Sequence, residues 1–101
     1  MTAIPKNEAI ERLAKAVEKA SSDDLLQIYT ELHPAHPLPD VTGTKAEHLA
    51  KELAAYIRAG IEPEEVVDLW NVVFPADRYV YYDEEDDVLR QRESRLKYAE
   101  Q

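Results

Sequence analysis

The histidines are the first candidates for chemistry in this sequence, because imidazole nitrogens are common ligands of zinc and similar ions. His33 and His36 are three positions apart, and Asp40 follows with a carboxylate. Glu31 and Glu47 are close enough in the sequence to add oxygen ligands. The prolines around the two histidines prevent a helical arrangement, and the spacing matches no known ligand pattern. A metal site at His33, His36 and Asp40 is therefore an open hypothesis, against the commoner situation in which such histidines cap a helix or face water.

The chain offers little for covalent or phosphate chemistry. It has no cysteine and only two glycines, so it has neither a thiol nucleophile nor a glycine-rich phosphate loop. Helix caps or an exposed helix face explain the serines Ser21, Ser22 and Ser94. No cofactor is indicated. We expect a protein that is not an enzyme, with a metal-dependent helical enzyme as a weak alternative.

Tyrosines followed by a run of acids form the most distinctive polar pattern. Tyrosines supply contact area at a small entropic cost, and carboxylates steer a positively charged partner. The pattern predicts partner binding by Tyr79, Tyr81, Tyr82, Asp83, Glu84, Glu85, Asp86 and Asp87. A structural explanation competes, in which the tyrosines pack over the helices and the acids only begin a helix.

The total charge favours the same kind of partner. Twelve basic and 21 acidic residues give a net charge of −9, which repels nucleic-acid phosphates and anionic lipids and attracts basic surfaces. We expect a non-enzymatic interaction or regulatory module that binds a basic protein surface or a second copy of itself, without direct binding to nucleic acid or membrane. The alternative is an acidic nucleic-acid mimic that inhibits a nucleic-acid-binding protein. Interleaved acids and bases along the helices count against the mimic.

Helices must position these residues, since apolar residues recur with helical spacing along most of the chain. The clearest case is Glu62–Pro75, which holds the single tryptophan and the single phenylalanine. Val66, Leu69, Trp70 and Val73 recur there at i, i+3, i+4 and i+7, one stripe of a helix. The same analysis predicts four helices, over about Pro5–Ala20, Asp23–His33, Lys45–Ala59 and Pro63–Pro75.

Several residues mark where these helices begin and end. Ser21 is a capping residue between the first two helices. Thr44 and Glu47 have the spacing of a capping box at the start of the third helix. Gly60 supplies the left-handed residue that ends it.

The chain also contains an apparent internal repeat. Asp23–Pro34 reads DDLLQIYTELHP and Glu64–Pro75 reads EEVVDLWNVVFP, with an aromatic residue at the same place and a closing proline. We therefore predict an all-α fold, a four-helix bundle of two pseudo-repeated helical hairpins at residues 5–33 and 44–75. The bundle core spans residues 1–75, and residues 76–101 form an acidic, tyrosine-rich extension packed on the same domain.

The extension allows two predictions. The acids after Tyr82 suit a helix N-terminus and the later arginines suit its C-terminus, which favours a C-terminal helix over about Glu84–Glu100. The alternative is a β-hairpin of Tyr79–Tyr82 and Val88–Arg92 that turns at the acidic block, Asp83–Asp87.

Length and composition limit the class of protein. A chain of 101 residues is one domain by the usual length relation. The sequence lacks a signal-peptide pattern and any run approaching the roughly 20 apolar residues of a membrane helix. With no cysteine, these features predict a cytoplasmic protein.

Overall fold

The computed structural model of this chain describes residues 3–77 and 80–91, in which four helices and three short strands form one mostly helical fold. The helices are α1 (Lys6–Glu18), α2 (Ser22–Leu32), α3 (Thr44–Ala59) and α4 (Pro63–Val73). A single 3-10 turn, η1 (Pro75–Asp77), follows α4. The strands are β1 (Ala3–Pro5), β2 (Val80–Asp83) and β3 (Val88–Gln91).

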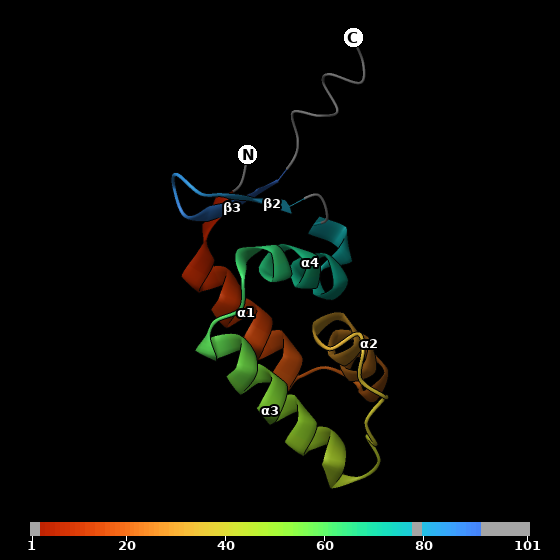
Figure 1. Cartoon of the computed structure of the whole chain (residues 1–101). Coiled ribbons are helices and arrows are strands. Elements are labelled where there is room, and N and C mark those ends of the chain that lie inside the picture. Colours follow the sequence, from red (N-terminus) through yellow and green to blue (C-terminus); the bar gives the residue numbers. More distant parts are fainter. Residues whose placement is uncertain (1–2, 78–79, 92–101) are drawn as a thin grey trace.

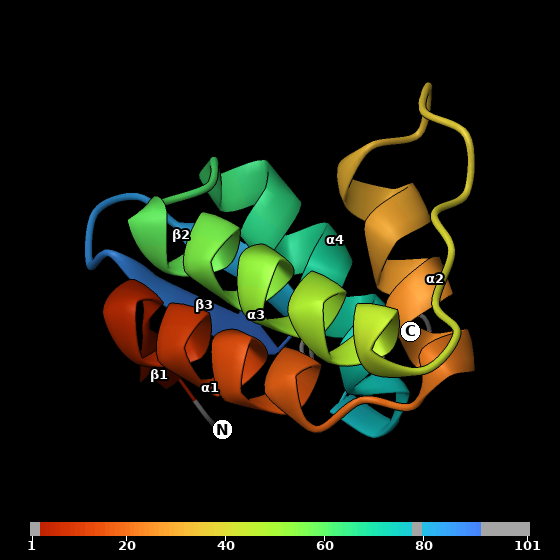
Figure 2. The same ribbon diagram turned by 90° about the horizontal axis from the view of Figure 1, so that it is seen from below.

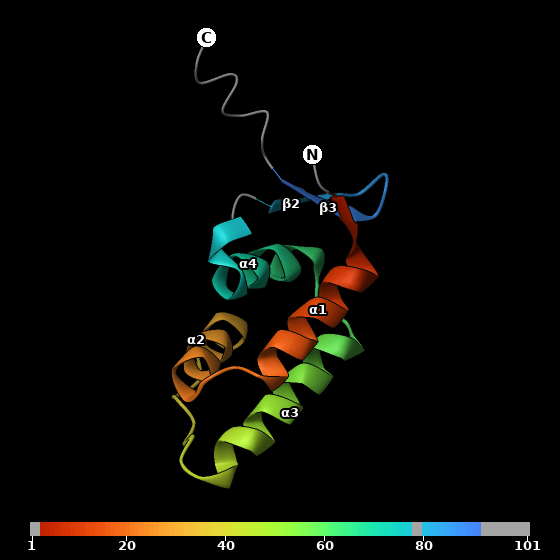
Figure 3. The ribbon, with the colours of Figure 1, turned by 180° about the vertical axis from the view of Figure 1, so that it is seen from behind.

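The helices pack in two pairs with the sheet across one end. α1 lies antiparallel along α3, and these two helices make the most extensive contact in the fold (Figure 2). α2 packs against α4 on the other side of the bundle, as the view from behind shows (Figure 3). The sheet lies over α4 and the beginning of α1 (Figure 1). Contact therefore runs mainly between the two predicted hairpins rather than within each of them.

The predicted apolar stripes form the core. Every helix contributes three or four buried residues, and Trp70 is only 4% exposed. Helices of this length would be only marginally stable in isolation. Burial of their apolar stripes against one another stabilises them. The buried helical residues are Ala9, Leu13, Ala14, Val17, Leu25, Ile28, Leu32, Ala50, Leu53, Ala54, Ile57, Val66, Leu69 and Trp70.

Helix ends follow the sequence signals in part. Ser21 accepts a hydrogen bond from the Asp24 N–H at 3.2 Å, so its capping role is confirmed. The predicted capping box at Thr44 is wrong, because α3 begins after Gly43 and has no side-chain cap. Gly60 ends α3 with φ +113°, a conformation that side chains disfavour.

An ion-pair cluster joins the two longest helices. Arg58 near the end of α3 donates to Glu11 at 3.1 and 2.9 Å and to Glu18 at 2.8 Å, two turns apart on α1. These bonds raise the pKa of Arg58, and the bond from Arg58 lowers the pKa of Glu11. The pairing fixes α1 beside α3 at their exposed border.

The two similar segments end in the same way. His33 after α2 has φ −135° and ψ 66°, and Phe74 after α4 has φ −122° and ψ 68°. Their N–H groups donate to the carbonyls of Tyr29 and Trp70, the aromatic residues matched in the repeat. This local likeness, and the pairing of α1 with α3 and of α2 with α4, agree with a pseudo-repeat. The superposition of the complete halves stays a prediction.

The all-α prediction needs correction at both ends of the chain. The C-terminal helix predicted over Glu84–Glu100 is wrong for residues 84–91, and residues 92–100 lie outside the described residues. The chain instead forms the hairpin of β2 and β3, with a four-residue turn at residues 84–87. Asp83 accepts the Glu85 and Asp86 N–H groups, so the first acid of the block stabilises a turn rather than a helix.

A strand at the chain start completes the sheet. β1 pairs antiparallel with β3, Ile4 opposite Leu89, which gives the strand order β1-β3-β2. Leu89 is 1% exposed and belongs to the core cluster, so the sheet and the helices share one core. The sheet thus pairs a strand of the predicted core, β1, with strands of the predicted extension, β2 and β3. Within the described ranges, no helix is long and apolar enough to cross a membrane.

Candidate functional site

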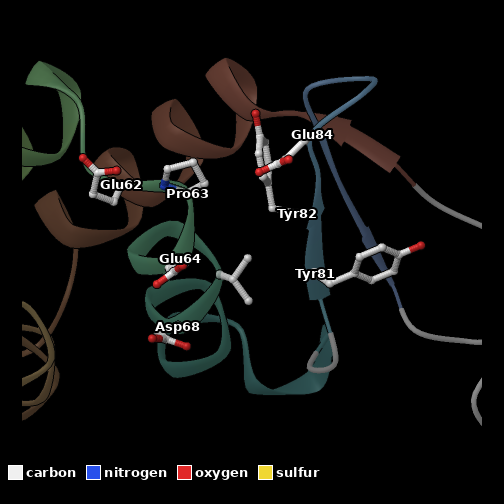
Figure 4. A pocket seen from close by; sticks show the side chains of 8 residues that line it. Glu62, Pro63, Glu64, Asp68, Tyr81, Tyr82 and Glu84 are labelled. Atoms are coloured by element: carbon white, nitrogen blue, oxygen red, sulfur yellow. The ribbon is translucent and has the colours of Figure 1, made fainter.

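A cavity of about 750 Å³ opens between the start of α4 and strand β2 (Figure 4). Acidic side chains and tyrosines dominate its wall, with a proline and a valine between them. Its lining residues are Glu62, Pro63, Glu64, Val67, Asp68, Tyr81, Tyr82 and Glu84. We call this the α4–β2 cavity. Three of the eight residues predicted to bind a partner, Tyr81, Tyr82 and Glu84, line it.

The carboxylates of the α4–β2 cavity differ in whether they already accept hydrogen bonds from the protein. The Glu62 side chain accepts the Glu65 N–H in a capping box at the start of α4. No hydrogen bond or ion pair among the described residues engages the side chains of Glu64, Asp68 or Glu84. Glu64 and Asp68 are one helical turn apart, so they lie on the same side of α4. The cavity therefore holds three carboxylates with acceptor capacity to spare.

Most carboxylates of the acidic block already form hydrogen bonds and ion pairs that stabilise the hairpin. Arg90 of β3 donates to Asp83 at 2.8 Å and to Asp86 at 2.6 Å. The bond from Arg90 lowers the pKa of Asp83, and the two carboxylates raise the pKa of Arg90. Asp87 accepts from the Tyr82 hydroxyl at 2.5 Å and lies 3.7 Å from the Lys6 ammonium. The residue with a positive φ in the turn is Asp87.

Tyr82 connects this turn to the α4–β2 cavity. Its hydrogen bond to Asp87, then its partial burial, and then the nearby acids raise its pKa to about 12. The Lys6 ammonium lies 5.8 Å from the centre of its ring. The hydroxyl of Tyr82 is therefore neutral and bonded, and its ring forms part of the cavity wall (Figure 4).

The predicted site is thus divided in space. Tyr81, Tyr82 and Glu84 come together at the α4–β2 cavity, whereas Asp83, Asp86 and Asp87 support the hairpin. Glu85 is exposed in the turn, and Tyr79 lies outside the described residues.

The acids that α4 contributes were missed as site residues. In the sequence, Glu62 and Glu64 are partners of the helix dipole, which explains them without any ligand. The available signal was the pair Glu64 and Asp68, at i and i+4 beside Val67 and off the buried stripe. Only the packing of α4 against β2 shows that this pair lines the same cavity as the tyrosines.

His33 and His36 belong to an aromatic cluster. The rings of His33 and His36 stack with centroids 5.1 Å apart and planes 14° apart, and Tyr29 and Tyr56 pack against them. Asp40 turns away to bond the N–H and hydroxyl of Thr42 and the Lys45 ammonium, which hold the pKa of its carboxyl well below its usual range. No three potential ligands gather around one point in the part of the chain that the structure describes.

A second cavity, of about 590 Å³, lies where α1 and α2 meet the end of α4. Apolar side chains including Ile28, Val73 and Phe74 line it, together with polar groups at its border such as Lys19 and Asp24. It brings together no acids of the α4–β2 cavity and none of the residues predicted to bind a partner.

The α4–β2 cavity, with its acids, tyrosines and adjacent strand, is therefore the candidate functional site. The chain matches no known family model, curated protein or solved structure.

Proposed function

We propose that this protein is a non-enzymatic interaction module that binds a basic surface of a partner protein through the α4–β2 cavity. The observation that carries the proposal is the convergence of Glu64, Asp68 and Glu84, without hydrogen-bonding or ion-pair partners in residues 3–77 and 80–91, on one cavity with two tyrosines. Carboxylates in this state can accept the donors of lysine or arginine without first breaking a bond within the protein.

The energetics favour this site over the rest of the acidic surface. An exposed acid with solvent on all sides contributes little to affinity, because salt and water screen it. In the cavity, the tyrosine rings and Val67 supply apolar surface beside the acids. Such surface packs against the hydrocarbon stem of lysine or arginine while the charged head reaches the carboxylates.

Pairing of charges elsewhere counts against the nucleic-acid mimic. Arg58 neutralises the row formed by Glu11 and Glu18, and Arg90 neutralises Asp83 and Asp86. A mimic of a phosphate backbone requires regularly spaced charges that remain unpaired.

The test is a triple variant, Glu64→Gln, Asp68→Asn and Glu84→Gln, with a matched control, Glu31→Gln, Glu47→Gln and Glu52→Gln. Each variant removes three negative charges, and the control acids are exposed and do not line the cavity. Binding is measured by calorimetry at low salt with basic peptides and by capture of partners from a native lysate. We expect the cavity variant to lose about tenfold in affinity, roughly 1.4 kcal/mol, and the control to lose much less.

Equal losses in the two variants would show that only net charge matters and would remove the cavity as the site. Unchanged binding of the cavity variant would have the same meaning. Circular dichroism of each variant checks that the fold is retained, since none of the six acids is buried.

A further inference from the structure

The α4–β2 cavity follows the edge of a strand. Neighbouring residues in a strand point to opposite faces, and both Tyr81 and Tyr82 line the cavity, so it runs along the side of β2. β3 occupies the other side of β2, and the order β1-β3-β2 places no strand on the cavity side within the described residues. Figure 4 shows β2 beside α4, with Glu64 and Asp68 on α4, Tyr82 on β2, and the ring of Tyr81 pointing away from α4.

We infer that β2 accepts an extended basic segment of a partner protein as a fourth strand of the sheet. This inference rests on the proposed function and adds the backbone conformation of the ligand and the pattern of its side chains. A strand edge offers N–H and C=O groups that an incoming strand can pair, and main-chain pairing of this kind gives affinity to many peptide-binding domains. The occupant is basic because the walls beside this edge are acidic.

The dimensions of α4 and of a strand agree with this arrangement. An added strand lies about 4.8 Å from β2, and its alternate side chains are spaced by about 6.8 Å along the strand. Glu64 and Asp68 are four residues apart on α4, which corresponds to about 6 Å along the helix axis. Lysine or arginine at alternate positions of the ligand therefore matches this pair of carboxylates. Glu84, just beyond the end of β2, lies within reach of a further basic side chain.

The side chains between the acids suit the same ligand. Val67 and Tyr82 line the same cavity as Glu64 and Asp68. The hydrocarbon stems of the basic side chains pack on these groups. The geometry thus points to a segment with basic residues at every second position, rather than to a single cation.

The test uses a synthetic peptide of seven residues in which lysine and valine alternate, acetylated and amidated at its ends. Two further peptides carry methyl groups on alternate backbone nitrogens, one on the lysines and the other on the valines. An extended strand directs alternate N–H groups to opposite edges, so each methylated peptide blocks one edge and keeps every charge. Affinities are measured by calorimetry with the complete protein, and hydrogen exchange of the β2 amides is followed with and without peptide.

Strand addition requires that one methylated peptide loses at least about tenfold in affinity, or 1.4 kcal/mol, while the other binds as the parent does. The β2 amides then exchange more slowly when the parent peptide is bound. Equal affinity of all three peptides would overturn strand addition and leave the proposed function intact. Equal loss in both methylated peptides would also overturn it, because a strand pairs through one edge. Failure of the parent peptide itself to bind at low salt would contradict both proposals.

Discussion

At the scale of single residues, Tyr82 shows how one side chain serves both the hairpin and the α4–β2 cavity. Its ring lines the cavity and packs against the core cluster, while its hydroxyl donates to Asp87 across the turn. The bond requires a protonated phenol, because the hydroxyl is the donor. Tyr82 therefore has a pKa of about 12, above the ordinary 10.0.

Replacement of Asp87 by asparagine should return the pKa of Tyr82 toward 10.0, because the charged acceptor is lost. Since the pKa is raised in the folded protein, the bond stabilises the fold fully below pH 10.0 and ceases to do so as the pH rises toward 12. The measurement is a carbon NMR titration of the tyrosine ring carbons. Asp86→Asn is the control, since Asp86 bonds Arg90 rather than Tyr82. An equal change in both variants, or none in Asp87→Asn, would contradict this cause.

The candidate site could be predicted from the sequence only in part. Tyr81, Tyr82 and Glu84 stand out as aromatic and acidic neighbours, and the structure places all three at the α4–β2 cavity. The sequence could not show which acids of the block are neutralised. That depends on Arg90, which reaches Asp83 and Asp86 only because the chain folds back as a hairpin. The acids of α4 join the site through tertiary packing alone.

At the scale of elements, the four helices were predictable because their apolar stripes repeat with helical spacing. Their observed bounds differ from the predicted ones by at most two residues, and the end of α3 and the start of α4 agree with the prediction. The C-terminal region was not predictable in the same way, because acids followed by bases satisfy both a helix dipole and a hairpin turn. β1 gave no signal: it has three residues, ends in Pro5, and depends on a partner strand near the other end of the chain.

Docking of the sheet on the helices depends on Leu89, the central residue of the sheet. Its replacement by alanine should lower the free energy of unfolding by about 2–5 kcal/mol, because a buried side chain leaves a cavity behind. Urea unfolding measures this change. Leu38→Ala is the matched control: Leu38 is 64% exposed and Leu89 is 1% exposed. The control should change stability by no more than about 0.5 kcal/mol. A loss that small in Leu89→Ala would mean that the sheet does not share the core.

At the scale of the whole molecule, the sheet connects the two ends of the described chain to the same core. β1 leads directly into α1, and the Lys6 N–H donates to the Asp87 carbonyl at 3.1 Å. Leu89 joins residues of all four helices in one core cluster. Loss of the sheet would expose that cluster and weaken the helices, so the two layers stabilise each other.

Sheet and helices should therefore unfold together in one transition. Fluorescence of Trp70, the single tryptophan, reports the packing of α4, and circular dichroism at 222 nm reports the helices. Both signals should change at the same urea concentration, as expected for a two-state domain of this size. Leu89→Ala should move both midpoints by the same amount, because the side chain that it removes belongs to the core shared by the two layers. Two separate midpoints would show that α4 unfolds apart from the other helices. Midpoints that do not move in Leu89→Ala would show that the sheet and the helices are independent units.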